Sequence, residues 1–320
     1  MLNEDLEQKT IMNKKYIIKN DVIIPIRWWF PFAQNTQDGK KGYIEGRQCN
    51  ILSEIVFETN YQINRNLHNI DLFDRRLQIQ RYNWYSDKNL EEWQGITLND
   101  DKLIVKIDIY NSGIIYLPES IGLYTNLKYL IVYGNKITNI PDSIYFCTNL
   151  ICMHFYNNKI SQLSKSICHC KYLISLNMYA NNLTELPDSI CLCENLEIIN
   201  VGDNQLTELP IEIGLCKKLN YLNVSANQLT ELPISITMLT QLIELIINNN
   251  KIINLPEFTN LSELKHLNIL KNKLTNIPIS IELCTNLNII VLDRYLIKDL
   301  PKSFRSIKER NYEIICFEII

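Results

Sequence analysis

The chain has 320 residues, of which 46% are hydrophobic and 21% are charged, so it can bury a sizeable core, which argues against wholesale disorder. A formal net charge of −3 creates no field strong enough to attract nucleic acid or an anionic membrane, and we expect neither as a partner. The N-terminal residues 1–10 are acidic, and the most apolar early stretch, residues 22–32, is too short to span a bilayer. These features predict a cytoplasmic, intracellular protein that is not secreted.

The first part of the chain, residues 1–91, shows no regular repeat. Residues 16–30 are rich in β-branched and aromatic side chains, which predicts one or two short strands. We expect this region to serve as a cap or an adaptor. Four apolar residues in it fit the repeat template described below, and they leave a degenerate extra coil and an amphipathic strand as alternatives: Leu67, Ile70, Leu72 and Leu77.

From Ile104 onwards, one pattern of apolar positions restarts about every 23 residues. Its clearest copy begins at Leu196 and has the form LxxIxVxxNxLTELPxxI. One interval, from Leu242 to Leu264, is 22 residues long, and the missing residue falls around residues 257–260. A segment that restarts with its apolar positions intact is one coil of a solenoid. The nine repeat starts are Ile104, Leu127, Leu150, Leu173, Leu196, Leu219, Leu242, Leu264 and Leu287.

Two further positions recur in each coil. One is a proline that ends the strand and turns the chain onto the opposite face, and Ser164 replaces it once. The other is an asparagine, whose side-chain amide can bond backbone groups of its own and the neighbouring coil that would otherwise be buried unpaired. Seven consecutive repeats carry this structural asparagine ladder: Asn135, Asn158, Asn181, Asn204, Asn227, Asn250 and Asn272.

The chain contains ten cysteines, and half of them share one repeat position, three residues before a repeat start: Cys147, Cys170, Cys193, Cys216 and Cys284. Because leucine fills this position in other coils, we expect small buried hydrophobic residues in a reducing compartment. Cys168 and Cys191 lie two residues earlier, where we expect them to face outward as neighbours. A surface thiol pair and a zinc site with His169 are alternatives there. Plain core and surface cysteines are the simpler interpretation, and we predict no metal.

The form LPxxIxxLxxLxxLxLxxNxL resembles the 23-residue class of leucine-rich repeat found in intracellular proteins, such as the plant Ras-group-related and Scribble-like families. The Asn- and Ile-rich composition is similar to that of leucine-rich repeat proteins of amoebae and giant DNA viruses. The residues Trp93-x-Gly95-Ile96 resemble a segment that caps such domains. The resemblance implies an α/β fold, a right-handed solenoid bent into a horseshoe arc. A parallel β-sheet would line its concave face, and short 3₁₀ or turn segments would line its convex face.

The predicted domain organisation follows from these boundaries. It comprises a non-repeat N-terminal region (1–91), a capping transition (92–103), nine leucine-rich repeats (104–309) and a C-terminal capping strand (310–320). The capping strand lies in residues 312–319 and would close an edge that otherwise invites association.

Strand residues that point away from the core form the concave face, since side chains alternate along a strand. Tyrosine fills the seventh position of the first four repeats, so successive rings are expected roughly 5 Å apart. Tyrosine is favoured in binding hot spots, and we therefore predict a partner-binding surface. A cross-strand aromatic ladder that stabilises the sheet is the alternative, and the two can coexist. The predicted surface comprises Tyr110, Tyr133, Tyr156 and Tyr179, with Tyr129, His154 and Tyr221 at nearby outward positions.

The sequence contains no phosphate-binding glycine loop, no HExxH and no G-x-S-x-G, so we predict no enzyme, no cofactor and no small-molecule substrate. The predicted function is a protein–protein interaction module that binds a partner protein on its concave sheet. The alternative is a ligase-adaptor-type protein, in which residues 1–91 recruit machinery and the repeats select the substrate.

Overall fold

The computed structural model describes residues 7–11, 14–19, 22–25, 94–301 and 313–317, and it describes side chains for residues 94–301. The chain divides into two compact units, Met1–Ile104 and Val105–Ile320. In the first unit, β1 (Glu7–Ile11), β2 (Lys14–Lys19) and β3 (Val22–Pro25) form an antiparallel sheet, and β4 spans Ile96–Leu98. β2 and β3 overlap the range 16–30 that was predicted to hold strands. The proposed extra coil at residues 67–77 and the capping Trp93 lie outside the described residues.

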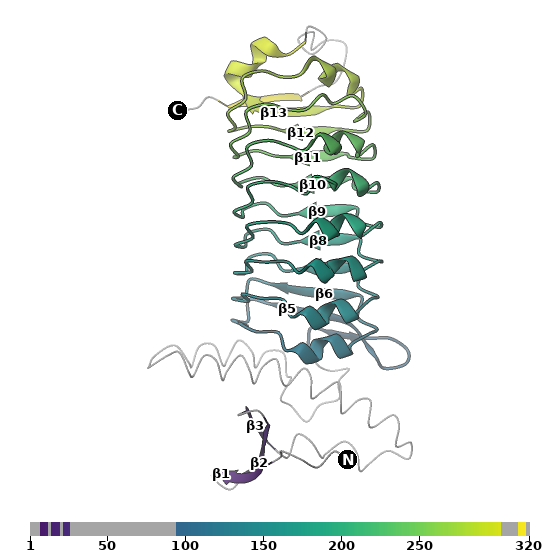
Figure 1. Cartoon of the computed structure of the whole chain (residues 1–320), viewed down its shortest axis with the longest axis vertical. Helices are drawn as coiled ribbons and strands as arrows, with labels where there is room; N and C mark the ends of the chain where they lie inside the picture. The colour runs from purple at the N-terminus through teal and green to yellow at the C-terminus, as the bar shows by residue number, and fades with distance from the viewer. Residues whose placement is uncertain (1–6, 12–13, 20–21, 26–93, 302–312, 318–320) are drawn as a thin grey trace. The chain divides into compact units, whose positions relative to one another are not determined.

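The second unit contains ten parallel strands that pair in chain order, stacked one above another in Figure 1. Paired residues are one repeat apart, so Tyr129 lies beside Cys152, and Glu244 lies beside His266 across the shorter interval. The predicted solenoid with a parallel sheet is therefore confirmed. The strands are β5 (Ile104–Tyr110), β6 (Tyr129–Tyr133), β7 (Cys152–His154), β8 (Ser175–Asn177), β9 (Ile198–Asn200), β10 (Tyr221–Asn223), β11 (Glu244–Ile246), β12 (His266–Asn268), β13 (Ile289–Asp293) and β14 (Glu313–Phe317).

Short 3₁₀ helices connect the strands on the convex side of the coils. A proline stands directly before most of them. Its backbone is extended there, and its fixed φ suits the residue at which the chain turns into the helix. Where Ser164 replaces proline, its hydroxyl accepts a hydrogen bond from the Ser166 N–H at 3.3 Å. The helices are η3 (Glu119–Leu123), η4 (Asp142–Phe146), η5 (Lys165–His169), η6 (Asp188–Leu192), η7 (Ile213–Leu215), η8 (Ile234–Met238), η9 (Ile279–Leu283) and η10 (Arg294–Asp299).

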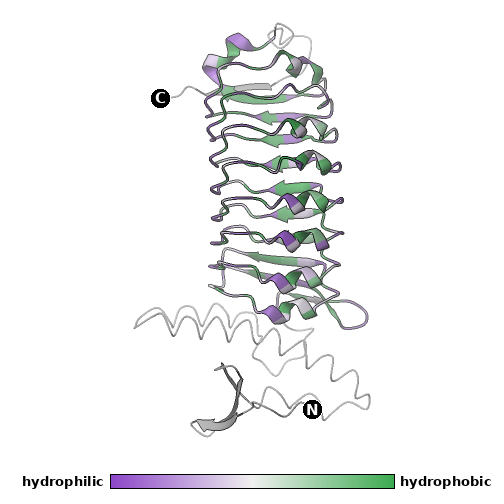
Figure 2. Ribbon diagram, in the orientation of Figure 1, coloured by the Kyte–Doolittle hydropathy of each residue, from purple (hydrophilic) through white to green (hydrophobic). Residues whose placement is uncertain are grey.

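The core runs through the middle of every coil. In β6, Leu130 and Val132 are fully buried and alternate with outward-facing residues, and Figure 2 shows hydrophobic residues along the strands and hydrophilic ones at the edges of the coils. The repeated cysteines are buried as predicted, and burial raises the pKa of the Cys147 and Cys193 thiols to about 12. The Cys193 thiol also donates to the Ile167 carbonyl of the preceding coil at 3.3 Å. Cysteine therefore packs as leucine does and additionally pairs a buried carbonyl.

The repeated asparagines connect each coil to the one before it. The Asn181 Oδ1 accepts from the Ile160 N–H at 3.0 Å, and its Nδ2 donates to the carbonyls of Phe155 and Met178 at 2.9 and 3.0 Å. The other asparagines of the ladder, from Asn135 to Asn272, make bonds of the same kind. A residue with φ between 47° and 64° comes directly before each of these asparagines, and before Ser112 in the first coil, and it turns the chain inward. These residues are Asn111, Gly134, Asn157, Ala180, Asp203, Ala226, Asn249 and Lys271.

The shorter interval changes one coil. Between Pro256 and Leu264 the described chain has turns but no 3₁₀ helix, in contrast to the coils on either side. Phe258 stands two residues after its proline and is fully buried, whereas Ile236 stands three residues after Pro233. Phe258 thus takes the buried position in the shorter coil that Ile236 takes in the coil before it. The Phe258 N–H donates to the Ser280 hydroxyl at 2.8 Å, which connects this coil to the next.

Candidate functional site

The concave face of β5, β6 and β7 carries a stack of three tyrosines. Tyr110 and Tyr133 have ring centroids 5.2 Å apart and nearly parallel planes, and Tyr133 and Tyr156 are 4.3 Å apart. Strand pairing sets this spacing, because these residues occupy the same repeat position in neighbouring strands. Stacking covers both faces of the Tyr133 ring, and all three side chains remain exposed or half-exposed. We call these three residues the tyrosine stack.

Burial, together with a hydrogen bond that the neutral Tyr156 hydroxyl donates to the Tyr133 side chain, raises the pKa of Tyr156 to about 12. The neutral phenol is therefore the form present at physiological pH, and it can donate as well as accept a hydrogen bond. The stack thus presents a preorganised, uncharged surface of phenol groups.

The fourth predicted member, Tyr179, does not continue the stack. Within the part of the chain that has described side chains, ring stacking ends at Tyr156. Tyr179 is 39% exposed and lies over Gly202, where an added Cβ would stand 3.0 Å from its Cδ2 atom. The same Cβ would be 2.9 Å from the Ser225 hydroxyl. Glycine at position 202 therefore leaves the space in which the Tyr179 ring rests.

Of the other predicted surface residues, Tyr129 and His154 lie on β6 and β7 beside the stack, and Tyr221 lies on β10, three strands beyond β7. Tyr129 is 39% exposed, and Tyr221 is half-buried, which raises the pKa of its phenol. The His154 Nε2 lies 2.9 Å from the Ser175 hydroxyl, and burial lowers the pKa of His154, so its imidazole is mainly neutral. At the stack's edge, Lys106 pairs with Asp108 at 2.9 Å.

Further along the sheet, asparagines end four strands, β8, β9, β10 and β12: Asn177, Asn200, Asn223 and Asn268. Each Oδ1 accepts the N–H two residues later, as in Asn223 to Ser225 at 2.9 Å. Asn223 and Ser225 are buried, and Asp293 is 1% exposed. This half of the face therefore offers fewer outward groups than strand alternation predicts.

Cys168 and Cys191 were both predicted to face outward, and the prediction is wrong for Cys191. Cys168 is half-exposed, but Cys191 is only 3% exposed and turns into the solenoid, where its thiol is hydrogen-bonded to Cys216 of the next coil. The eight cysteines with described side chains are all free thiols. Among the described residues, no group of three or more His, Cys, Asp or Glu side chains could hold a metal ion.

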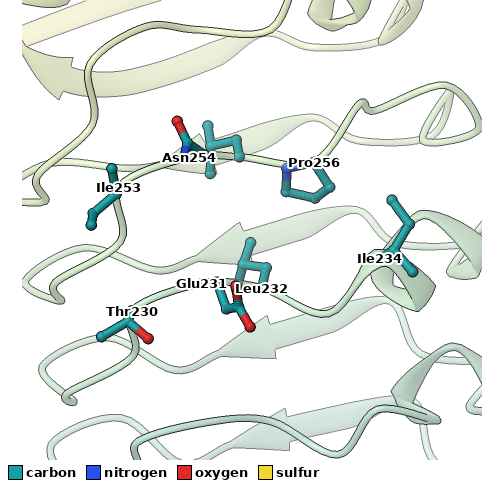
Figure 3. Close-up of a pocket in the computed structure, with 8 residues that line it drawn as sticks. Thr230, Glu231, Leu232, Ile234, Ile253, Asn254 and Pro256 are labelled. Atoms are coloured by element: carbon teal, nitrogen blue, oxygen red, sulfur yellow. The ribbon is translucent and has the colours of Figure 1, made fainter.

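Sequence reasoning missed one surface feature, a groove beside the shorter coil. It has a volume of about 410 Å³ and lies between two adjacent coils (Figure 3). The 22-residue interval was a signal for it, as was an isoleucine at position 253, where neighbouring repeats have threonine. Its lining residues are Thr230, Glu231, Leu232, Ile234, Ile253, Asn254, Leu255 and Pro256.

No protein-family model matches the chain, and no curated protein matches it either. Solved structures do. A plant peptide hormone receptor, RGFR1 in complex with RGF2, is 28% identical with a TM-score of 0.55, and the match covers 63% of this chain and 34% of the receptor chain. The Arabidopsis thaliana GASSHO1/SCHENGEN3 ectodomain, in complex with CASPARIAN STRIP INTEGRITY FACTOR 2, is an LRR (leucine-rich repeat) domain. It is 20% identical with a TM-score of 0.55, and the match covers 69% of this chain and 31% of that one.

The chain is a leucine-rich repeat protein. The structure of PEPR1–AtPEP1 extends the match to 84% of this chain and 41% of that one, with a TM-score of 0.62 and 22% identity. This leucine-rich repeat protein thus spans between about a third and two fifths of the receptor chains that it matches. No helix among its described residues is long and apolar enough to cross a membrane.

Proposed function

We propose that this leucine-rich repeat protein is a non-enzymatic module that binds a partner protein on its concave sheet, with the tyrosine stack as the main contact. The single observation that carries the proposal is the stack itself, because its rings are held parallel by their neighbours while their side chains remain exposed or half-exposed. A surface that is ordered before binding loses little entropy on complex formation. Phenol groups supply contact area together with hydrogen-bonding capacity, as binding hot spots require.

The comparison with the RGFR1 receptor, solved with the peptide RGF2, supports a polypeptide ligand for this repeat class. Tyr129, Tyr179, Tyr221 and His154 would extend the contact around the stack. We also propose an intracellular, reducing location. The buried free thiols support it, since disulfides are the common alternative in oxidising compartments. The adaptor alternative concerns residues 1–91, most of which lie outside the described residues, and no described contact favours it.

Affinity capture from the native source cell tests the concave site. The bait would be the wild-type chain or a variant with Tyr133→Ala, Tyr156→Ala and Tyr179→Ala. A matched control carries Phe146→Ala, Leu192→Ala and Leu215→Ala, which are exposed apolar residues of the 3₁₀ helices. We expect the concave variant to lose specific partners by at least about tenfold while the control retains them. Circular dichroism verifies that both variants are folded, and equal capture by both would rule out this face.

A further inference from the structure

The groove beside the shorter coil is built from two adjacent coils. Thr230, Glu231, Leu232 and Ile234 line it from one coil, and residues 253–256 line it from the next (Figure 3). Leu232 is only 6% exposed, whereas Ile234 is 69% exposed and Ile253 is 48% exposed. Two large aliphatic side chains therefore stand in solvent at opposite ends of a recess (Figure 3).

The groove lies next to a place in the described chain where one 3₁₀ helix is missing. Elsewhere, the 3₁₀ helix of each coil packs against that of the next, as η7 does against η8. In the following coil no 3₁₀ helix is present between Pro256 and Leu264 within the described chain, so η8 lacks such a neighbour. The shorter coil that lacks this helix forms one wall of the groove.

The isoleucine at position 253 has no evident role in the core. Thr184, Thr207, Thr230 and Thr275 occupy the same position in other coils, so a polar residue suffices for the fold. Ile253 nevertheless replaces threonine beside the groove and leaves about half of its surface exposed. Burying exposed aliphatic surface against another molecule is favourable, which gives this departure from the repeat a physical use.

The surroundings of the groove are acidic. Glu185, Glu208 and Glu231 share one repeat position on three successive coils, and all three are exposed. Among the described residues, none of these three carboxylates has a hydrogen bond or an ion pair. Lys251 is close in sequence, but its ammonium group donates to the Gln228 Oε1 at 3.1 Å. The row of carboxylates along the solenoid therefore favours a positively charged ligand.

We propose that this groove binds an extended segment of a protein partner that inserts one large apolar side chain into the recess whose two ends are Ile234 and Ile253, and places flanking arginine or lysine residues on Glu208 and Glu231. The apolar side chain contributes the affinity, and the carboxylates select for basic flanks. This site lies on the loop side of the coils and does not depend on the concave tyrosines, so either proposal can fail without the other.

The probe is the peptide acetyl-Gly-Arg-Gly-Leu-Gly-Arg-Gly-amide, titrated into the full chain with isoleucine methyl groups labelled for NMR. Two matched peptides replace both arginines with glutamate or the leucine with glycine. We expect the basic leucine peptide to shift the methyl signals of Ile234 and Ile253, with the signal of Ile279 as a reference. Ile279 is 74% exposed in η9 and lies outside the groove. Both matched peptides should bind at least about tenfold more weakly.

Two variants complete the test. Ile253→Thr restores the residue of the neighbouring repeats, so it should fold normally and weaken binding by about fivefold, whereas Ile279→Thr should leave binding unchanged. The double variant Glu208→Lys, Glu231→Lys should reverse the preference toward the glutamate-flanked peptide. The proposal is overturned if the groove methyl signals stay unshifted up to about 1 mM peptide. Equal shifts with all three peptides, or wild-type binding by Ile253→Thr, would overturn it as well.

Discussion

The coils that carry the tyrosine stack and the coils that follow them are built alike inside and differ on the concave face. The coils of β5 to β7 and β9 to β11 share buried aliphatic residues and a left-handed residue, and all but the first of them carry an inward asparagine. At the seventh repeat position, however, the first group carries Tyr110, Tyr133 and Tyr156, and the second carries Gly202, Ser225 and Asn248. Core positions that hold the coil and surface positions that meet a partner are thus separate sets of residues.

This separation means that the outward residues can differ between coils while the inward residues of each coil stay the same. The boundary between the two groups lies at Gly202, which receives the ring of Tyr179. If the separation holds, substituting an inward residue should lower the free energy of unfolding equally in both regions. Substitutions at the seventh position should lower it by different amounts in the two regions.

The largest effect is expected for the asparagine ladder. Asn158→Ala and Asn227→Ala each remove one bond to a backbone N–H and two to buried carbonyls, at 2.7–3.1 Å. Each should lower the free energy of unfolding by about 3 kcal/mol, measured by urea denaturation. The exposed neighbour Asn182→Ala is the control and should change it by less than about 0.5 kcal/mol. Clearly different losses of unfolding free energy for Asn158→Ala and Asn227→Ala would show that the inward residues do not contribute equally in the two regions.

The next effect separates the two regions. Tyr133→Ala removes two ring contacts and should cost about 2 kcal/mol of unfolding free energy. Ser225→Ala at the same repeat position should cost less than about 1 kcal/mol. If the two substitutions cost the same in thermal or urea denaturation, the stack does not stabilise the sheet, and the aromatic-ladder interpretation would be withdrawn.

The boundary itself can be tested with Gly202→Ala. The new methyl group would press on Tyr179 and Ser225, so we expect a loss of about 1–2 kcal/mol from overpacking. The same substitution in a Tyr179→Ala background should cost less, because the ring that resists it is gone. A double-mutant cycle measures the difference, and a coupling energy near zero would show that Tyr179 does not rest on this glycine.

The smallest effect concerns pH. The pKa of Tyr156 rises from 10.0 to about 12 on folding, mainly through burial. This tyrosine therefore ionises first in the unfolded chain, and its contribution to stability, complete below pH 10, declines as the pH rises toward 12. Melting temperatures recorded over this range should fall less steeply for Tyr156→Phe than for the wild type. An unchanged slope in the variant would assign the alkaline loss to other groups.

The repeat period predicted the positions of the strands, because strand and turn residues recur within each coil and need no distant information. The inward orientation of Cys191 could not be predicted in this way, since it depends on a thiol partner in the next coil. The departure of Tyr179 from the stack depends on the empty space at Gly202. The groove depends on how the residues of two particular coils lie beside each other. The repeat period cannot predict these three features, because each depends on particular residues in an adjacent coil.

The asparagine bonds also fix the increments in which this molecule can change length. Every coil offers the next one the same donors and acceptors, so only a whole coil can be added or removed without leaving a buried group unpaired. The separation between the tyrosine stack and the groove is therefore a discrete quantity that changes in steps of one strand spacing, about 4.8 Å. A partner that contacted both sites would therefore bind only to a solenoid with the right number of coils between them.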